Sequence, residues 1–322
     1  MNSLPSIPPG LWPVMLTPFH SDHRIDWAAF DELVDWYIDS GASGLFAVCL
    51  SSEMYQLSED ERLSLARRAV ARSAGRVPVV VGGTFGSSVE AIAAFSQRLF
   101  GTGVSAVVCL TNQFCTESAG PARWQEGAER FLSLIDSAIP LGLYECPMPY
   151  KWLLSTSQTA WAARTGRFRF VKDTSCRIEL IRARIEVARG TGLRLFNANT
   201  ATLLESLRSG ADGYSGIAAN YMPQLYAWLC AHHASEPATA ERVHRFLSVA
   251  DALVSARYPA ASKIFLGSCG LRISRHCRIS EPAFAEEDLL ALDALRGEAQ
   301  SWCEKLGLPQ LSRPHTASLQ PS

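Results

Sequence analysis

Short apolar runs alternate with longer amphipathic segments along most of the 322-residue chain. The apolar runs predict strands at residues 11–19, 44–50, 77–83, 104–110, 141–146, 168–173, 193–197 and 213–219. The amphipathic segments predict helices at residues 26–40, 58–73, 88–100, 121–137, 155–164, 177–189, 200–208 and from 223 onward. Ser58 with Glu61, and Ser155 with Gln158, have the capping-box spacing that begins a helix. The pattern therefore predicts eight successive strand–helix units.

The predicted strands are apolar on both faces, as expected for parallel strands that helices cover on both sides. Alternating strands and helices predict an α/β fold with a parallel sheet, and eight units predict closure into a (β/α)8 TIM barrel. An open, doubly wound sheet is the alternative. No Gly-x-Gly-x-x-Gly sequence follows the first strand, however, so a dinucleotide site is not supported.

Four regions are predicted along the chain. Residues 1–10 are rich in Pro and Ser and predict a loose arm, and residues 11–234 form the barrel. Residues 235–306 predict a C-terminal helical bundle, with helices at 239–256, 261–269 and 286–306. Residues 307–322 are polar and contain several prolines, which predicts a loose tail.

Composition and charge narrow the classes of protein. Hydrophobic residues make up 48% of the chain, charged residues 19%, and the net charge is −1, which are globular values. No block of like charge indicates a nucleic-acid or membrane partner. The N-terminus has no basic segment followed by an apolar core, and no apolar run is long enough to span a bilayer. The chain is predicted to be soluble and cytoplasmic.

The nine cysteines and seven histidines give no sign of a metal site or a disulfide framework. No Cys-x-x-Cys pair occurs, and Cys49, Cys109 and Cys146 lie in apolar runs, where a free thiol behaves as a small hydrophobe. The pattern favours a reducing compartment. We expect neither a metal nor an organic cofactor.

Lys172 ends the sixth apolar run, directly after Phe170 and Val171. A lysine is rarely fully buried unless it is paired, and desolvation lowers the pKa of its ammonium group. A lysine in such a place can act as a nucleophile at neutral pH. The alternative is an ordinary lysine at a strand end whose head reaches water.

In a (β/α)8 barrel the active site lies at the carboxyl ends of the strands. This places Lys172 at one mouth with Tyr144, which is near the end of the fifth strand. A lysine that forms a Schiff base needs a proton relay when the carbinolamine loses water, and a phenol can supply it. Hydroxyls and backbone N–H groups at the other strand ends suit the carboxylate of a keto acid. The predicted substrate-binding residues are Ser51, Ser52, Ala198 and Ser215.

Segments 44–57, 144–147, 171–174 and 210–220 resemble the dihydrodipicolinate synthase / N-acetylneuraminate lyase family of pyruvate-type class I aldolases, and the resemblance runs from about residue 10 to 305. Its most specific piece is Tyr-x-x-Pro at residues 144–147, followed about 28 residues later by Lys172. The resemblance implies that Lys172 forms an imine with a 2-keto acid and that Tyr144 relays protons. It also implies that Ser51 binds the keto-acid carboxylate, with Ser52 in the position of the usual glycine.

Three departures from the family pattern argue against a true dihydrodipicolinate synthase. The family's Gly-Thr-Thr-Gly-Glu reads Cys-Leu-Ser-Ser-Glu at residues 49–53, so Leu50 replaces the threonine that links the catalytic tyrosine to a tyrosine of a neighbouring subunit. Residues 111–114 lack the Tyr-Tyr that would supply that second phenol. The arginine that holds the second substrate's carboxylate is missing after Tyr-x-x-Pro, where Lys151 is the nearest cation. Condensation with aspartate semialdehyde is therefore not expected.

The other polar residues near the strand ends are predicted to be structural or have two possible roles. Neighbours on a strand face opposite ways, so Glu145 is predicted to point toward the helices and pair there with an Arg or Lys. Glu53 is predicted to tie down its loop through backbone donors. Asn197, Asn199 and Thr200 either bind substrate hydroxyls or cap the next helix. An aromatic rim of the mouth is expected from Phe114, Tyr150 and Trp152.

The sequence thus predicts a Schiff-base lyase or aldolase that acts on pyruvate or a 2-keto-3-deoxy acid. A dehydratase of a keto-deoxy sugar acid, working through the same imine, and a non-catalytic keto-acid-binding barrel remain alternatives. A metal-dependent aldolase lacks the ligand spacing. The expected partner is a small 2-keto acid, with no nucleic acid or membrane. The resemblance implies a homo-oligomer, a tetramer or a dimer, although the loss of the inter-subunit tyrosine removes one reason to require the tetramer.

Overall fold

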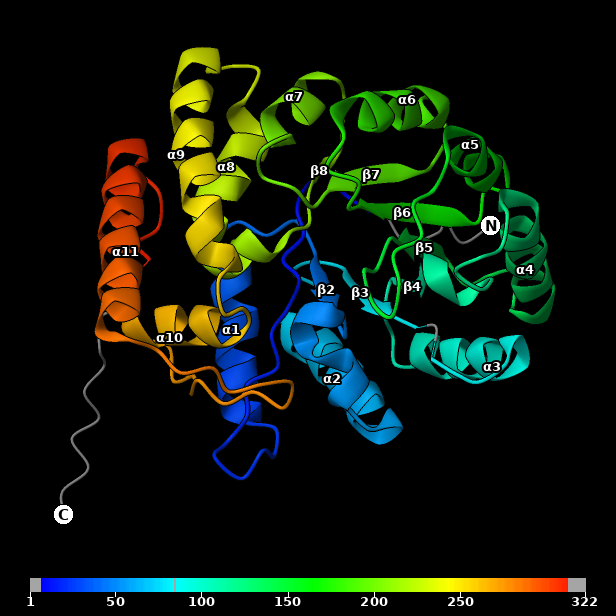
Figure 1. Ribbon diagram of the computed structural model, residues 1–322, viewed down its shortest axis with the longest axis horizontal. Coiled ribbons are helices and arrows are strands. Elements are labelled where there is room, and N and C mark those ends of the chain that lie inside the picture. The colour runs from blue at the N-terminus through cyan, green and yellow to red at the C-terminus, as the bar shows by residue number, and fades with distance from the viewer. Residues whose placement is uncertain (1–6, 84, 312–322) are drawn as a thin grey trace.

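Within the residues that the structure describes, 7–83 and 85–311, eight parallel strands form one curled sheet in the order β1-β8-β7-β6-β5-β4-β3-β2 (Figure 1). The structure is a computed structural model. The strands are β1 Gly10–Leu11, β2 Leu45–Ala47, β3 Val79–Gly82, β4 Ala106–Leu110, β5 Leu141–Tyr144, β6 Phe168–Asp173, β7 Arg194–Asn197 and β8 Gly213–Tyr214. Beyond β1, a bridge from Val14 to Phe46 of β2 closes the circle. The predicted (β/α)8 barrel is confirmed.

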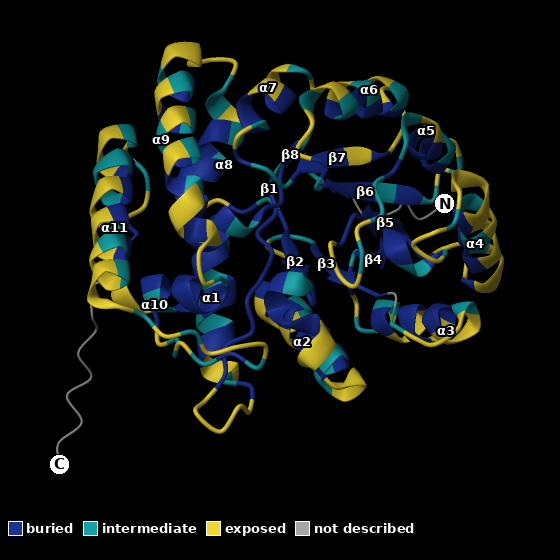
Figure 2. Cartoon of the chain, viewed as in Figure 1, coloured by how far each residue is buried: buried dark blue, intermediate teal, exposed yellow. Residues whose placement is uncertain are grey.

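Helices follow the strands and cover the outside of the barrel. They are α1 Trp27–Asp39, α2 Glu59–Ser73, α3 Val89–Phe100, α4 Pro121–Leu134, α5 Thr156–Arg164, α6 Ile178–Ala188, α7 Leu203–Arg208 and α8 Pro223–His232. Both predicted capping boxes form: Ser58 exchanges hydrogen bonds with Glu61, and Ser155 exchanges them with Gln158. Figure 2 shows the strands buried and the outer helices exposed on the side that faces away from the barrel.

The C-terminal helices lie on one side of the barrel (Figure 1). They are α9 Pro237–Ser255, α10 Ala260–Ser268 and α11 Glu286–Leu306, and α11 packs against α8, α9 and α10. Ile7 and Leu311, which belong to the predicted arm and tail, are buried. Residues 1–6 of the predicted arm and 312–322 of the predicted tail lie outside the described residues. No helix in the described part of the chain combines the length and apolarity needed to cross a bilayer.

The first and last strands are much shorter than predicted. The expected strand at 11–19 reduces to β1, because Pro13 and Pro18 have no N–H to donate to a neighbouring strand. The expected strand at 213–219 reduces to β8 and continues as a 3-10 turn, Ile217–Asn220. Gly213 is required here, since a Cβ on it would lie 1.8 Å from the carbonyl oxygen of Gly10 across the β1–β8 pair.

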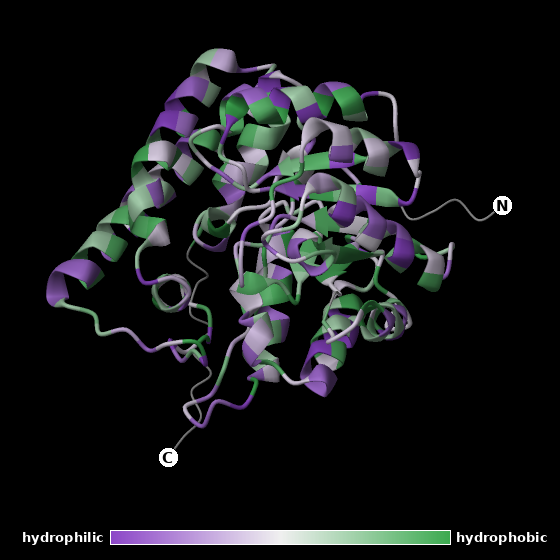
Figure 3. Ribbon diagram, turned by 45° about the vertical axis from the view of Figure 1, so that its right-hand side comes forward, coloured by the Kyte–Doolittle hydropathy of each residue, from purple (hydrophilic) through white to green (hydrophobic). Residues whose placement is uncertain are grey.

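An aromatic layer fills the barrel below its carboxyl-end mouth. The rings of Phe170 and Phe196 are stacked, with their centres 4.6 Å apart. Trp12 and Phe46 contact Phe170 edge to face, with ring centres 5.4 and 5.8 Å from its own. Figure 3 shows hydrophobic residues at the centre of the barrel and hydrophilic ones on the outer helices. A polar group placed directly above this layer is therefore removed from water on its inner side.

Candidate active site

Lys172 projects into the barrel from the end of β6, directly opposite Tyr144 of β5. Its side chain is only 4% exposed. Its Nζ lies 4.4 Å from the centre of the Tyr144 ring and 5.6 Å from that of Phe46. Burial lowers the pKa of Lys172 to about 8, against smaller opposing effects of the Cys49 and Cys146 thiols. Roughly a tenth of Lys172 is therefore an uncharged amine at pH 7, compared with well under one part in a thousand for a lysine with the ordinary pKa of 10.5.

A second buried lysine, Lys263, has the ion-pair partner that Lys172 lacks. The Nζ of Lys263 forms an ion pair with Glu53 at 2.9 Å and donates to the carbonyl of His276 at 2.7 Å. No carboxylate among residues 7–83 and 85–311 forms an ion pair with Lys172. Lys263 is thus a structural cation, whereas Lys172 is a buried amine without a counter-ion.

The Cys146 thiol follows β5 and lies close enough to the Tyr144 phenol for each group to affect the pKa of the other. Cys146 also adds to the rise that burial causes in the pKa of Tyr55, whose hydroxyl donates to the Met148 carbonyl at 2.8 Å. Burial raises the pKa of Tyr144 well above that of a free phenol, with Cys146 adding to the rise. Tyr144 is therefore protonated at neutral pH and can donate its proton beside Lys172.

A buried ion cluster holds the outer sides of the same two strands. Glu145 and Asp173 directly follow Tyr144 and Lys172, and both bind the guanidinium of Arg184 on α6. All three side chains are fully buried. Glu145 also accepts the backbone N–H groups of Leu154 and Thr174 at 2.7 and 2.9 Å, while burial raises its pKa. The predicted outward orientation of Glu145 is confirmed, and the cluster fixes the strand ends that carry Lys172 and Tyr144.

The loop after β2 carries Ser51 and Ser52 in a 3-10 turn, Leu50–Ser52. The Ser52 hydroxyl donates to the Met15 carbonyl at 2.6 Å and accepts from the Cys49 N–H at 3.1 Å, so it is used within its own loop. The predicted substrate contact of Ser52 remains a prediction. Glu53, at φ 58°, accepts the N–H groups of Arg278 and Ile279 besides the Lys263 ammonium, which confirms its role in tying down the loop.

Tyr258 is a residue that the sequence analysis did not single out, and it lies between α9 and α10, outside the strand–helix units. Its oxygen accepts from Asn220 Nδ2 at 2.8 Å. Burial raises the pKa of Tyr258, with a smaller opposing effect of the nearby Ser51 hydroxyl. The C-terminal helical region therefore brings a phenol close to the loop after β2, and no motif in the chain marked that residue.

The predicted residues Ala198 and Ser215 follow β7 and β8, the two strands beyond β6 on the side away from β5. The fully buried Oγ of Ser215 has no hydrogen-bond partner among the described residues. The Ala198 N–H donates to the Asp173 carbonyl at 2.9 Å, which ties the end of β7 to β6. Asn197 and Asn199 bind Thr202 at the start of α7, so the structure favours their capping role.

The segment after β4 clamps the loop after β5. Asn112 Nδ2 lies 3.1, 2.7 and 2.6 Å from the carbonyl oxygens of Cys146, Met148 and Tyr150, which share its two protons. The Lys151 ammonium donates to the Thr174 carbonyl at the end of β6. Both groups thus have structural partners at the mouth.

The expected aromatic rim is wrong for Phe114. Its ring is buried against α4, where it contacts Trp124 and Phe131 at 5.6 and 5.5 Å. Tyr150 and Trp152 are half-buried. The prediction failed because the 3-10 turn after β4, Thr111–Gln113, directs the chain toward α4, so the Phe114 ring does not reach the mouth of the barrel.

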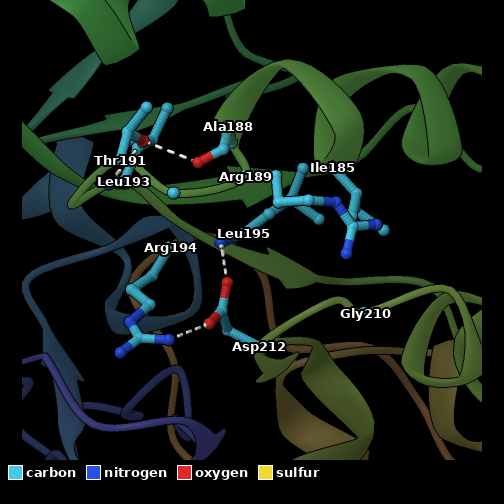
Figure 4. Close-up of a pocket in the computed structure, with 10 residues that line it drawn as sticks. Ile185, Ala188, Arg189, Thr191, Leu193, Arg194, Leu195, Gly210 and Asp212 are labelled. Carbon is cyan, nitrogen blue, oxygen red and sulfur yellow. Dashed lines mark hydrogen bonds and ion pairs between the residues drawn. The ribbon is translucent and has the colours of Figure 1, made fainter.

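A surface pocket at the other end of the barrel is separate from this site (Figure 4). It lies where β7 begins, between Arg189 and Arg194. Arg194 forms an ion pair with Asp212 at 2.6 Å, and Asp212 also accepts the Leu195 N–H. Arg189 is paired in turn with Glu186, outside the pocket, and no lysine or cysteine is among the lining residues. In the described residues, no group of three or more His, Cys, Asp or Glu side chains is placed to hold a metal ion.

Known proteins resemble this chain over most of its length. The profile described as the Dihydrodipicolinate synthetase family matches residues 8–295. The 4-hydroxy-tetrahydrodipicolinate synthase of Neisseria gonorrhoeae is 29% identical over 267 residues, covering 80% of this chain and 88% of the relative.

Solved structures share the fold. A prophage protein of the dihydrodipicolinic acid synthase family from E. coli K12, described in complex with pyruvate, superposes with a TM-score of 0.80 at 23% identity, covering 90% of this chain and 98% of its own. A protein described as the first monomeric dihydrodipicolinate synthase variant also has a TM-score of 0.80, at 20% identity, covering 94% of this chain and 97% of its own.

Proposed function

The chain belongs to the dihydrodipicolinate synthetase family, and on that basis we propose that it is a class I lyase or aldolase in which Lys172 forms an imine with pyruvate or another 2-keto acid. The observation that carries the proposal is the buried Lys172 amine, without an ion-pair partner in the described chain, beside the Tyr144 phenol. A relative of the same fold is described in complex with pyruvate, which supports this class of ligand.

The proposed reaction starts when the Lys172 amine attacks the keto carbon and forms a carbinolamine. Tyr144 gives its proton to the carbinolamine hydroxyl, water leaves, and a protonated imine remains. In the cleavage direction the Tyr144 phenolate takes the proton of the C4 hydroxyl, the electron pair of the C3–C4 bond moves into the protonated imine, an aldehyde departs and an enamine is left. Tyr144 then returns this proton to C3 of the enamine, which restores the protonated imine. Water hydrolyses the imine, its extra proton goes back to the Tyr144 phenolate, and pyruvate and the Lys172 amine are released. No step in this sequence uses a metal or an organic cofactor.

We propose further that this protein does not catalyse the dihydrodipicolinate synthase condensation. Leu50 stands where the synthases have the relay threonine, and Asn112 is used to clamp the loop after β5. No arginine follows Pro147 closely, and the Lys151 ammonium is bonded to a backbone carbonyl. No arginine is therefore placed there to bind the carboxylate of aspartate semialdehyde. A 2-keto-3-deoxy acid is the better candidate, and a homo-oligomer, a dimer or tetramer, is the expected assembly.

A pyruvate-release assay tests the proposal. The protein is incubated with a panel of 2-keto-3-deoxy acids, and pyruvate is measured by its reduction with lactate dehydrogenase and NADH. A lyase releases pyruvate, and Lys172→Ala abolishes the release. A dehydratase consumes the keto acid without releasing pyruvate. A protein that binds keto acids equally well with and without Lys172, and turns over none of them, would be a binding barrel and would overturn the proposal.

A further inference from the structure

Ser215 differs from the polar residues at the ends of the neighbouring strands, because its buried hydroxyl has no hydrogen-bond partner among the described residues. Thr174, at the end of β6, donates to the Glu145 carbonyl at 2.7 Å. Thr200, after β7, has its hydroxyl 3.0 Å from that of Tyr226. A buried hydroxyl without a partner costs free energy, and a ligand that pairs with it recovers this cost.

The two residues that flank Ser215 show that its side chain faces the inside of the barrel. The ring of Tyr214 is stacked on that of Tyr226 of α8, with ring centres 4.3 Å apart, so Tyr214 faces outward. A Cβ on Gly216 would lie 2.2 Å from the Tyr214 hydroxyl, so position 216 faces the same side. Because side chains alternate along an extended chain, Ser215 faces the interior.

The strand register places Ser215 on the same inner surface as Lys172. Lys172 of β6 pairs with Phe196 of β7, and Phe196 pairs with Gly213 of β8. Two residues further along these strands come Ala198 and Ser215, whose N–H groups donate to carbonyls of the preceding strand at 2.9 and 2.8 Å. Ser215 therefore lies above the aromatic layer, on the side of Lys172 away from β5.

The two sides of Lys172 differ in the space that they leave for a ligand. On the β5 side, the Tyr144 ring fills the neighbouring inward position, with its centre 4.4 Å from the Lys172 Nζ. On the β7 side the inward residues are the small Ala198 and Ser215, and Ala198 is half-buried. A keto acid bound to Lys172 therefore has room for its carbon chain on the side of Ser215.

The surroundings of the Ser215 hydroxyl indicate an uncharged partner. A buried carboxylate needs several donors or a cation, but the neighbouring inward residues Ala198 and Gly213 have no polar side chain. A hydroxyl both donates and accepts, so a ligand hydroxyl and that of Ser215 satisfy each other. In the proposed reaction Lys172 bonds C2 and Tyr144 serves the C4 hydroxyl, which leaves a hydroxyl further along the chain for Ser215.

We propose that Ser215 binds a hydroxyl on C5 of the substrate, in the part that departs as the aldehyde. The protein then prefers 2-keto-3-deoxy acids with a C5 hydroxyl to acids that have a methyl group there. The inference rests on the proposed function, because it takes the imine at Lys172 as the anchor of the ligand. Ser215 determines specificity and has no part in forming the imine.

Two matched substrates test this preference. 4,5-Dihydroxy-2-oxopentanoate and 4-hydroxy-2-oxopentanoate differ only in the C5 hydroxyl, and pyruvate release gives kcat/KM for each. We expect the parent to prefer the dihydroxy acid. Ser215→Ala should lower kcat/KM for that acid by roughly 3- to 10-fold, the size of one hydrogen bond between uncharged groups, and leave the other acid within about twofold.

Urea unfolding of the ligand-free protein provides a second readout. Ser215→Ala should raise the urea midpoint, because it removes a buried hydroxyl that has no partner in the described chain. Ser206→Ala is the matched control, since this fully buried hydroxyl donates to the Leu203 carbonyl at 2.7 Å and accepts from Asn197 at 3.0 Å. It should lower the midpoint and leave the preference between the two acids unchanged.

Pyruvate trapping on Lys172 separates this inference from the proposed function, since pyruvate has no C5. Ser215→Ala should trap pyruvate as the parent does. Equal losses for the two acids, no loss for either, weaker pyruvate trapping, or a lower urea midpoint in Ser215→Ala would each overturn the inference. A parent that forms the pyruvate adduct without preferring the dihydroxy acid would overturn it as well. A parent that forms no adduct on Lys172 would instead overturn the proposed function.

Discussion

The Nζ of Lys172 lies 4.4 Å from the centre of the Tyr144 ring, and the two residues are paired directly across β6 and β5. The contact brings a buried amine and a buried, protonated phenol to one point at the carboxyl end of the barrel. Each residue is followed by a carboxylate that Arg184 holds on the outer side of the sheet. The inner, reactive pair is thus positioned by an outer ion cluster.

Tyr144→Phe is expected to slow imine formation by about 10²- to 10⁴-fold, because the ring stays beside Lys172 while the proton donor is lost. The rate of pyruvate trapping under cyanoborohydride measures this. Tyr150→Phe is the control, since the single hydroxyl proton of Tyr150 is shared between the carbonyls of Asn112 and Cys115. Equal rates for Tyr144→Phe and the parent would show that the phenol has no part in the proton transfer.

The rate of imine formation should rise with pH and level off near pH 8. Below its pKa of about 8, Lys172 is mostly an ammonium ion, which cannot attack the carbonyl, so the rate should fall about tenfold per pH unit. Trapping on the protein is compared with trapping on a free lysine derivative at the same pH, which corrects for the reagent. A profile that kept rising to pH 10, as for the free amine, would contradict a desolvated Lys172.

Lys172→Met should make the protein more stable at pH 7 by about 3 kcal/mol, which is the free energy that corresponds to the lowered pKa. Below pH 8 both folded and unfolded chains carry the proton, and folding must desolvate the charge. Between pH 8 and the ordinary value of 10.5 the folded chain has released its proton and the unfolded chain has not, so the parent gains stability as pH rises.

Urea unfolding of the parent and the variant at pH 7 and pH 10 measures this difference. The advantage of Lys172→Met should be largest at pH 7 and should fall to about 1 kcal/mol by pH 10. Lys151→Met, at an exposed lysine, is the control for removing a lysine that is not buried. A variant that is less stable than the parent at pH 7 would mean that burial of Lys172 carries no penalty.

Arg184→Met should destabilise the fold by about 3–5 kcal/mol, because it leaves Glu145 and Asp173 buried without their counter-ion. The matched control is Arg182→Met on the same helix, whose ion pair with Glu205 is half exposed and should contribute less than about 1 kcal/mol. Urea unfolding at pH 7 gives both values. Similar small losses for the two variants would show that the buried cluster does not stabilise the strand ends.

The barrel could be predicted because a buried parallel strand needs an apolar run and a covering helix needs an amphipathic one, and both patterns are local. The meeting of Lys172 and Tyr144 follows from the same rule, since both stand at ends of neighbouring strands. The lengths of β1 and β8 could not be predicted from apolarity. They depend on the missing N–H of Pro13 and on the close approach of Gly10 and Gly213.

Tyr258 could not be found from the sequence because its contacts depend on tertiary folding. It lies between two helices after the barrel, and no spacing rule connects it with Ser51 or Asn220. Phe114 shows the reverse case: an aromatic residue after a strand end resembles a rim residue, but a single turn directs it into the packing beneath α4. Side-chain direction in loops is set by turns that the apolar pattern does not encode.

The most direct test of the account is reduction of the pyruvate imine with borohydride, followed by peptide mass spectrometry. The chain has four lysines, Lys151, Lys172, Lys263 and Lys305, so the modified residue can be assigned without ambiguity. The account predicts one reduced pyruvyl adduct, on Lys172, that is absent from Lys172→Met. No adduct under conditions that trap a known family member, or an adduct on another lysine that persists in Lys172→Met, would contradict it.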